Sequence, residues 1–509
     1  MAEYTTQQYI DSLKKDRKVL VDNLVSKGIE ASEDETFTTL APKVANIGDV
    51  SIDDCSYFFS NGARVNEFLN NPSLFSTLKL KNTYGMFNSY NVLKENILDN
   101  ILLNMPFYNE ANISNMFKGY TGANIYNLSE TTLNVVPNWA HLFDGFNARS
   151  VDLSNIDTSN VINMSYMFNG TSNVDLKGFQ NLNLSNVVDI SYMFNTSGHY
   201  FGNFILSNYD TQNVINASRM FNYIRVYNAP LVQMNNFELI NAENVVAMFD
   251  NMSLYNTTNL DLGGVKFYKE INAYSMFGRL SSNTLQSVTL PNFVNGINNA
   301  YGMFLYWSCA NLTEINNFQI DFSKVDSMAM AFSSMNLPNM TSFNLSWIDT
   351  AKINNFWYCF GNLAIDKIDN LGIENWNVSN ATNVSSMFSL LRCPNITTLN
   401  LANWTINNSS SRFSMDGMFS YSHYLVDINI SNISLSYVYI ANIFKNCVNL
   451  QRCDIRGLGI SDYPSLNNAF TGVPSNCTII VGNTNVKSVL QNVYPNLTNI
   501  VTADEYDNM

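Results

Sequence analysis

The sequence has little charge and few of the residues that most often carry chemistry. Only 13% of its 509 residues are charged, three are histidine, and its seven cysteines include no C-x-x-C pair. Lysine and arginine number 27 against 41 acidic residues, which gives a formal net charge of −14. Without a basic face, binding of nucleic acid is disfavoured, and the acidic chain repels anionic surfaces at long range.

Long apolar runs are also absent from the sequence. No run of 18 apolar residues occurs, so we expect no transmembrane helix and no membrane insertion. The N-terminal stretch MAEYTTQQYIDSLKKDRK contains no apolar h-region, and we expect no secretory signal in it.

Sequence motifs of catalysis are missing as well. The chain has no G-x-S-x-G, H-E-x-x-H or glycine-rich phosphate loop. Its histidines are widely separated, at His141, His199 and His423. The carboxylate pair of a glycosidase has no motif and stays open, but many aspartates stand in polar corners where turn formation accounts for them. We expect no enzyme activity, no cofactor and no metal site.

What the chain has in abundance is one repeat. Residues 150–170 read SVDLSNIDTSNVINMSYMFNG, and close relatives of this stretch recur along the chain. The phenylalanine of each M-F pair, or its equivalent, is a marker that returns 16 times, at intervals of 25 to 31 residues. A period of this size is the signature of a solenoid. The markers are Phe59, Phe87, Phe117, Phe143, Phe168, Phe194, Phe221, Phe249, Phe277, Phe304, Phe332, Phe360, Phe388, Phe419, Phe444 and Phe470.

Each repeat unit follows the same order. A short alternating run such as VDL at 151–153 predicts a half-buried strand. A polar corner such as SNIDTSN follows, in which Asn, Asp and Ser bond to their own backbone. We expect a short helical segment at the S-x-M-F turn, and then a loop, often of the form C-x-N-L, that leads to the next strand. One unit cannot bury its apolar face alone, whereas stacked units share a continuous core.

The repeat signature carries a family resemblance. NIDTSNVINMSYMF at 155–168 and NWNVSNATNVSSMF at 375–388 resemble the BspA-like leucine-rich repeats of bacterial surface proteins and their asparagine-rich relatives in mycoplasma surface lipoproteins. The resemblance spans about residues 51–485. It implies an α/β solenoid, a leucine-rich-repeat array of about 16 coils. It implies function only weakly, because a fold does not fix a function.

Several side chains keep the phase of the repeat. Methionine precedes phenylalanine in ten of the 16 pairs, and we interpret this position as a buried slot that accepts soft side chains. Asparagine occupies 81 positions and can form ladders where equivalent corners stack. Cys309, Cys393 and Cys447 each open a C-x-N-L loop. We therefore predict buried thiols, with zinc or disulfides as the alternatives.

The tryptophans divide into two groups. Trp376 and Trp404 occupy a corner position that isoleucine fills elsewhere, and we expect them to be packed. Trp307, Trp347 and Trp357 depart from the repeat pattern in neighbouring coils. Because aromatic residues dominate binding hot spots, these three are candidates for a sugar- or protein-binding patch. The alternative is that they pack against loop insertions.

The two ends of the chain do not follow the repeat. Residues 1–50 predict an amphipathic helix, with Val19, Leu24 and Val25 among its apolar positions, and a shorter helix after the capping-box pattern at 32–35. Residues 476–509 predict a last strand, NCTIIVG, and a helix, TNVKSVLQNVYPNL, that covers the open edge of the last coil. We divide the chain into a helical module (1–50), a solenoid (51–475) and a C-terminal cap (476–509).

The helical module carries a second resemblance. Residues 13–48, LKKDRKVLVDNLVSKGIEASEDETFTTLAPKVANIG, are similar to N-terminal modules of minor structural proteins in phage tails and baseplates. This resemblance implies a virion protein, located in a phage tail or surface appendage and attached to other virion proteins through residues 1–50. Two helices of this size cannot form a core alone. They must dock on the solenoid, on copies of themselves in a homo-oligomer, or on a larger partner.

The two resemblances together give the functional hypotheses. The leading one is a non-enzymatic bacteriophage structural protein, in a tail fibre, baseplate or other host-facing appendage. Its solenoid would bind a host cell-surface protein or glycan. One alternative is a bacterial BspA-like surface adhesin. Another is a scaffold or capsid-decorating virion protein without a receptor role.

Overall fold

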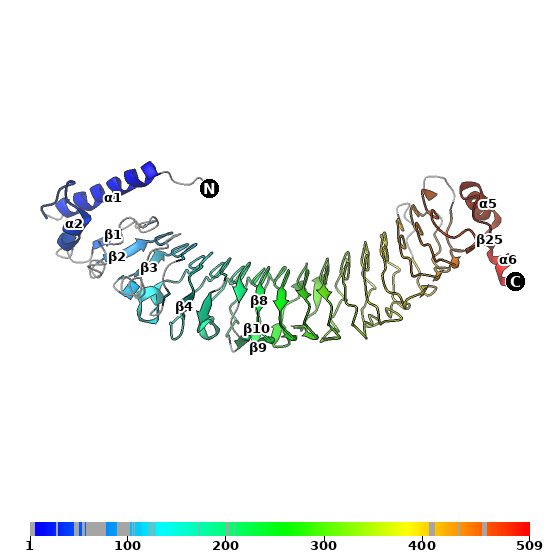
Figure 1. Cartoon of the computed structure of the whole chain (residues 1–509), viewed down its shortest axis with the longest axis horizontal. Helices are drawn as coiled ribbons and strands as arrows, with labels where there is room; N and C mark the ends of the chain where they lie inside the picture. The colour runs from blue at the N-terminus through cyan, green and yellow to red at the C-terminus, as the bar shows by residue number, and fades with distance from the viewer. Residues whose placement is uncertain are drawn as a thin grey trace. The chain divides into compact units, whose positions relative to one another are not determined.

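In the computed structural model the described residues confirm the predicted solenoid (Figure 1). It is a β-solenoid of about 13 coils with few helices, where an α/β array of about 16 coils was expected. The structure describes residues 6–26, 29–44, 50–52, 56, 78–88, 102–103, 105, 107–121, 124–125, 128–172, 174–199, 203–207, 209–406, 413–435, 438–460 and 466–509. The first marker, Phe59, and Cys55 lie outside these residues. The chain divides into unit 1, residues 1–200 with 209–214, and unit 2, residues 201–208 with 215–509.

The two helices predicted in unit 1 are present, as α1 (Thr6–Ser26) and α2 (Phe37–Val44). Leu24 of α1 and Leu40 of α2 are fully buried. Val19 and Val25 were predicted on the apolar face but are 50% and 54% exposed, because Val21 takes the inward position instead. No helix in the described residues is long and apolar enough to cross a membrane.

The coils of unit 1 pair through short parallel strands. One sheet joins β1, β2 and β3 in that order, and a second joins β4 and β5. The run VDL at 151–153 overlaps β4, as predicted. The elements are β1 (Val50–Ile52), β2 (Leu78–Asn82), β3 (Phe107–Asn112), β4 (Ser150–Asp152), β5 (Asp175–Lys177), β6 (Gly198–His199), and the 3-10 helices η2 (Leu128–Glu130), η3 (Thr132–Val135) and η4 (Phe179–Asn181).

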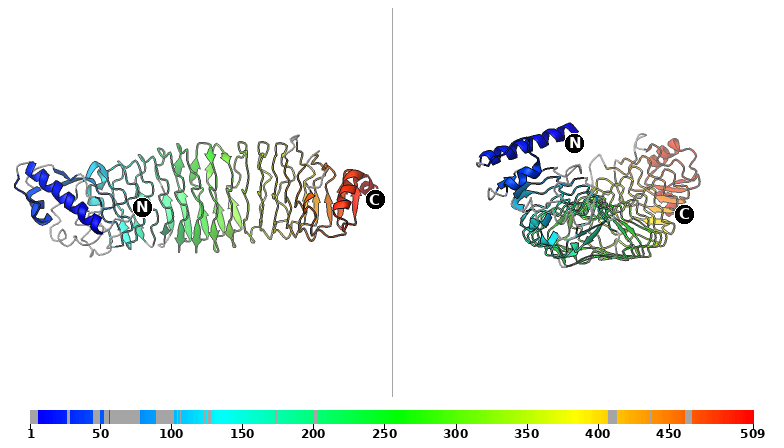
Figure 2. Two further views of the ribbon diagram at one scale, coloured as in Figure 1. Left: turned by 90° about the horizontal axis from the view of Figure 1, so that it is seen from above. Right: turned by 60° about the vertical axis from the view of Figure 1, so that its left-hand side comes forward.

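The first coils of unit 2 carry several strands each, and equivalent strands of successive coils lie side by side in parallel rows (Figure 2). One row is β7 (Phe204–Ser207), β9 (Leu231–Asn235), β12 (Asn259–Asp261), β16 (Ser287–Thr289) and β20 (Glu314–Asn316). A second is β8 (Arg225–Tyr227), β11 (Ser253–Tyr255), β15 (Ser281–Ser282) and β19 (Ser308–Cys309). The shorter rows are β10 (Phe237–Leu239), β13 (Val265–Phe267) and β17 (Asn292–Phe293), and β14 (Ile271–Asn272) with β18 (Ile297–Asn299).

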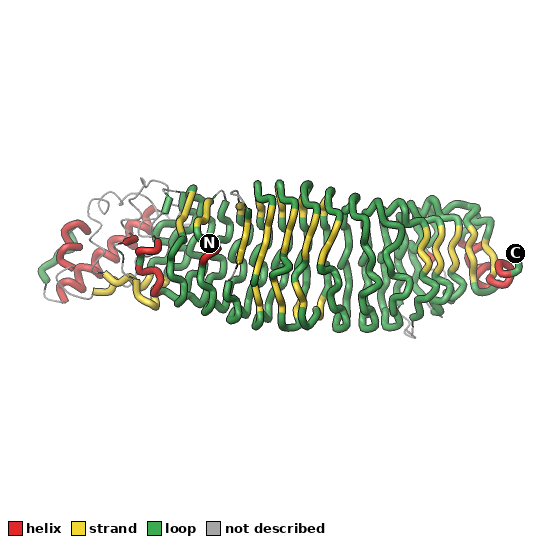
Figure 3. Tube along the Cα trace, turned by 90° about the horizontal axis from the view of Figure 1, so that it is seen from below, coloured by secondary structure: helices red, strands yellow, loops and turns green. Residues whose placement is uncertain are grey.

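The last coils of unit 2 form a five-stranded parallel sheet (Figure 3). The predicted strand and helix are both present, as β24 and α5, but β25 adds one more strand beyond them. The edge is therefore formed by β25, with which α5 and α6 are in contact. The elements are β21 (Thr398–Asn400), β22 (Asp427–Asn429), β23 (Arg452–Asp454), β24 (Thr478–Val481), β25 (Ile500–Thr502), α5 (Thr484–Val493) and α6 (Ala503–Asp507).

The S-x-M-F segment forms hydrogen-bonded turns, so the predicted short helical segment is wrong. In the coil of Phe168, the N–H of Met167 donates to the carbonyl of Met164, three residues earlier, at 3.2 Å. Tyr166, the third residue of this turn, has a φ of 57°, the left-handed value that a type II turn requires. The N–H of Phe168 donates to Met193 of the next coil at 2.9 Å. A helix would have used these N–H groups internally.

A residue with left-handed φ recurs two positions before each marker phenylalanine of the described coils. These residues are Gly85, Asn115, His141, Tyr166, Tyr192, Arg219, Ala247, Ser275, Gly302, Met330, Tyr358, Ser386, Gly417, Asn442 and Asn468. Most of them are not glycine, although a left-handed backbone costs about 1–2 kcal/mol in other residues. A side chain just before the turn also stabilises it. In the coil of Phe168, the side-chain oxygen of Asn163 accepts a hydrogen bond from the N–H of Ser165 at 2.9 Å.

The core of each unit is a ladder of phenylalanine rings. In unit 2, Phe304 stacks between Phe277 and Phe332 at centroid distances of 5.6 and 5.5 Å. In unit 1, Phe143 stacks between Phe117 and Phe168 at 5.2 and 5.8 Å. The methionines that precede the markers are buried throughout the described coils, which confirms the interpretation of that position as a core slot.

The C-x-N-L loops join successive coils through both of their polar side chains. The thiol of Cys309 donates to the carbonyl of Leu280 in the preceding coil at 3.7 Å, and the amide of Asn311 donates to Asn283 at 2.7 Å. Six cysteines are free and buried, at 309, 359, 393, 447, 453 and 477. The prediction of buried thiols is therefore confirmed for the described cysteines. Asparagine side chains also bond to each other between successive coils, as Asn195 donates to Asn169 at 2.7 Å and Asn256 to Asn228 at 2.9 Å.

Candidate binding groove beside Trp347

The structure separates the three tryptophans that were predicted as one patch. Trp307 is 1% exposed, packs edge-on against Phe304 and donates its indole N–H to the carbonyl of Phe277. It fills an inward position that Leu280 occupies one coil earlier. The prediction that Trp307 is part of a binding patch is therefore corrected, because a ring enclosed in the core cannot contact a ligand.

Trp357 is exposed, but it lies on a different part of its coil. Its side chain is 40% exposed and stands three residues before the marker Phe360, on the M-F turn. Equivalent turn positions carry Tyr274 and Tyr301, whose rings stack at 5.2 Å. Trp357 thus belongs to a surface of turns and lies outside the groove described next.

Trp347 is half-buried and its ring is fixed from several sides. The indole contacts Phe318 and Phe322 edge-on, with ring centroids 5.4 and 5.8 Å apart. Its N–H donates to the carbonyl of Asn344 at 3.0 Å, and the side chain of Asn344 accepts the N–H of Ser346 at 2.9 Å. These contacts hold the corner at 344–347 in one conformation and leave part of the indole exposed.

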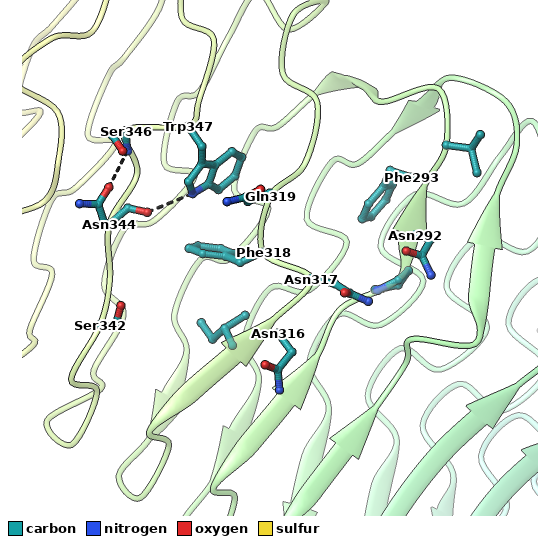
Figure 4. Close-up of a pocket in the computed structure, with 13 residues that line it drawn as sticks. Asn292, Phe293, Asn316, Asn317, Phe318, Gln319, Ser342, Asn344, Ser346 and Trp347 are labelled. Atoms are coloured by element: carbon teal, nitrogen blue, oxygen red, sulfur yellow. Dashed lines mark hydrogen bonds between the residues drawn. The ribbon is translucent and has the colours of Figure 1, made fainter.

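A groove of about 840 Å³ lies beside this ring, in unit 2 (Figure 4). Its walls come from three successive coils, at residues 291–294, 315–319 and 342–347. The first wall includes β17 and the second begins in β20, and each of these is the last strand of its row. In the coil that follows, residues 338–350 form turns without a strand. The groove therefore lies where the regular strand rows end.

The lining of the groove combines apolar rings with uncharged polar groups. Phe293, Ile315, Phe318 and Trp347 are half-buried, and Figure 4 shows the rings of Trp347 and Phe318 next to each other. The polar members are exposed amides and hydroxyls, at Asn292, Asn316, Asn317, Gln319, Ser342, Asn344 and Ser346. None of the thirteen lining residues is charged. Polar side chains outnumber the aromatic rings in this lining, so hydrogen bonds would make up much of the contact with a bound ligand.

Three of the cysteines and one of the histidines have defined structural contacts. Burial raises the pKa of the Cys309, Cys393 and Cys447 thiols to about 12, so they are protonated at neutral pH. His141 bonds Asp144 at 3.0 Å and stacks on Tyr166 at 4.5 Å within the turn surface of unit 1. Within the described residues, no group of three or more His, Cys, Asp or Glu side chains could hold a metal ion.

Comparison with known families accounts for the repeat. The chain matches the family described as "Mycoplasma protein of unknown function, DUF285" over residues 111–201, 171–290, 297–432 and 364–483. The chain belongs to the DUF285 family. This confirms the resemblance to mycoplasma-type repeats.

The helical module of the DUF285 protein lies outside the matches, and its similarity to phage modules stays a prediction. The unmatched residues 291–296 include the first wall of the groove.

A search of the curated proteins gives no match to the DUF285 protein. Among solved structures, it is similar to the one titled "Crystal structure of TLR13-ssRNA13 complex", at 11% identity and a TM-score of 0.16. The alignment covers 86% of this chain and 63% of that chain, so the DUF285 protein spans less than two thirds of its length.

Sequence reasoning selected Trp347 but missed its surroundings. Trp347 stood out because it departs from the repeat pattern, whereas the asparagines of the groove are hidden among 81 asparagines. Phe318 gave a weaker signal, since it is an aromatic residue outside the marker positions. The groove itself depends on where strand rows end, which the sequence does not mark.

Proposed function

We propose that this DUF285 protein is a non-enzymatic recognition protein of the adhesin type, which binds a ligand on a cell surface through its solenoid. The observation that carries the proposal is the uncharged groove beside Trp347, with a fixed aromatic ring on one wall and exposed amides along its rim. Such a site recognises a ligand by shape and hydrogen bonding. The resemblance of the repeats to those of bacterial surface proteins supports the same function.

The position of the groove suits contact with a large surface. It opens on a stack of repeated coils, and repeat proteins use such extended surfaces for binding. Contact at several coils, or by several copies of the chain, would add avidity to a weak single site. Recognition of this kind needs no cofactor and no metal.

The test is the binding of fluorescently labelled full-length protein to intact bacterial and animal cells. Wild type is expected to bind at least one cell type saturably. Ser342→Trp, which places a bulky ring at an exposed groove position, is expected to reduce that binding. Trp357→Ala, outside the groove, is the matched control and should bind as wild type does. Absence of saturable binding, or equal binding by Ser342→Trp, would overturn the proposal.

A second candidate is a virion protein that binds a host surface. It is favoured by the similarity of residues 13–48 to phage tail modules and by the exposed Val19 and Val25 of α1, which offer an apolar surface for attachment. Under this reading, residues 1–50 attach to other virion proteins and the groove faces the host. Mass spectrometry of purified phage particles from the source tests it, because the chain must then be present in the particles.

A further inference from the structure

We infer that the groove beside Trp347 binds a neutral oligosaccharide. The inference rests on the proposed recognition function and names its ligand class. Three properties of the groove carry it: a fixed aromatic platform, a rim of amides and hydroxyls, and a lining without charge.

The aromatic platform is the indole of Trp347. The apolar C–H face of a pyranose ring packs on an aromatic ring, while its hydroxyl groups stay at the edge. The indole N–H is already bonded to Asn344 and the ring is held by Phe318 and Phe322. The platform is therefore ordered before a ligand arrives, and binding loses little side-chain entropy.

The rim provides partners for hydroxyl groups. A sugar hydroxyl both donates and accepts, and asparagine and glutamine side chains carry a donor and an acceptor on one planar group. Gln319 is exposed, and Figure 4 shows its side chain beside the Trp347 ring. The amides of Asn292 and Asn317 donate to the carbonyls of Gly263 and Leu290, at 2.9 and 3.2 Å. These bonds orient the side chains of Asn292 and Asn317. The side-chain oxygen of each amide can then accept a hydrogen bond from a sugar hydroxyl.

The absence of charge in the lining selects a neutral ligand. A charged ligand would lose water on entry without finding a counter-charge, which is costly. The net charge of −14 on the chain adds long-range repulsion against anionic sugars such as sialylated glycans. An acidic or a basic peptide is disfavoured because the lining offers no counter-charge to either.

The size of the groove indicates a ligand longer than one sugar ring. Its volume of about 840 Å³ and its walls from three successive coils exceed what a single ring fills. Trp347 stands at one side and β17 at the other, so a chain of sugars can cross the coils. We therefore expect affinity to rise from a monosaccharide to an oligosaccharide of the same type.

The experiment is a binding screen of the full-length protein against neutral oligomers of glucose, galactose, mannose and N-acetylglucosamine, followed by calorimetry of the best binder. Trp347→Ala is expected to lower affinity by about tenfold or more, as for a central aromatic contact, while Trp347→Phe retains part of it. Gln319→Ala, an exposed change that leaves the core intact, should also weaken binding. Trp357→Ala should match wild type, and a sialylated form of the best binder should bind more weakly.

The outcomes separate this inference from the proposed function. Cell binding that is lost after periodate oxidation of surface sugars, together with a neutral oligosaccharide hit sensitive to Trp347→Ala, supports the inference. Cell binding that survives periodate but is lost after protease treatment, with no hit in the screen, means that the groove binds a protein. The inference is then wrong while the recognition function stands. An affinity unchanged by Trp347→Ala and Gln319→Ala would also overturn it.

Discussion

At the scale of single residues, two buried tryptophans differ in one hydrogen bond. Trp404 and Trp139 are both fully buried. The indole N–H of Trp404 donates to the carbonyl of Ile373 at 2.8 Å, whereas that of Trp139 finds no hydrogen-bond partner among the described residues. A buried donor without a partner keeps its full desolvation cost. The contribution of the same side chain to stability should therefore differ between the two sites.

We predict that Trp404→Phe destabilises the fold by about 1 kcal/mol more than Trp139→Phe does, since only the first change removes a hydrogen bond. Both changes remove a similar ring volume, so each serves as the control for the other. Chemical denaturation followed by circular dichroism gives the comparison. Equal losses of stability would contradict the hydrogen-bond assignment at Trp404.

Asp144 links stability to pH at the turn of its coil. Burial raises the pKa of its carboxyl group, but hydrogen bonds from His141 and Asn169, with Lys118 nearby, outweigh this and leave the pKa below its usual value. A carboxyl whose pKa is lower in the folded state stabilises the fold above its unfolded pKa, about 3.9. That stabilisation is lost as the pH falls through the folded-state pKa.

Asp144→Asn should therefore be less stable than wild type between about pH 5 and pH 7, and the difference should shrink as the pH falls below about 3.9. Melting temperatures of the two proteins across this range provide the measurement. A difference that stays constant from pH 7 to pH 3 would show that packing, not charge, accounts for the effect.

At the scale of the elements, the M-F turn depends on one backbone conformation. Gly302 has a φ of 58° at the third position of a turn in which Met303 donates to Ala300 at 3.2 Å. An added Cβ would meet its neighbours no closer than 3.4 Å, so space is available. A substitution there changes mainly the cost of the left-handed backbone.

Gly302→Ala is thus expected to destabilise the fold by about 1–2 kcal/mol. Gly302→Asn, which adds a larger side chain but tolerates left-handed φ, should cost less. Denaturation midpoints of the two variants decide between backbone and packing, because a packing effect would make the larger asparagine worse than alanine.

The same turn shows how far the sequence could predict the elements. The alternating run at 151–153 predicted β4, and the repeat period predicted the regular spacing of the phenylalanine ladder, because burial leaves a direct mark on the pattern of side chains. The turn could not be predicted, since Tyr166 and Met330 adopt a left-handed φ without the glycine that usually signals it. Bonds to the next coil impose that conformation, and a single repeat does not reveal them.

The candidate site was predictable only in part, for a similar reason. Trp347 departs from the repeat pattern and could be selected from the sequence, but Trp307 departs from it as well and is buried. The difference depends on which position of a stacked coil each ring occupies. The other walls, at 291–294 and 315–319, come from different coils and meet only in the folded array.

At the scale of the whole molecule, the DUF285 repeats form a stack of coils whose hydrogen bonds run mostly between neighbouring coils, and the uncharged groove beside Trp347 lies on this stack. Two aromatic side chains of the groove walls also contact the phenylalanine ladder, because Phe318 packs edge-on against Phe304 and Phe293 packs edge-on against Phe277. The proposed role requires that the chain be displayed where cell surfaces can be reached.

The most direct test is immuno-electron microscopy of the source organism with an antibody against the solenoid. Label on the outer face of intact cells is the result that the proposed adhesin role predicts. Label on the tails of phage particles would contradict cellular display and establish the virion reading instead. Label confined to the interior of cells, with none on cell surfaces or particles, would contradict surface recognition altogether.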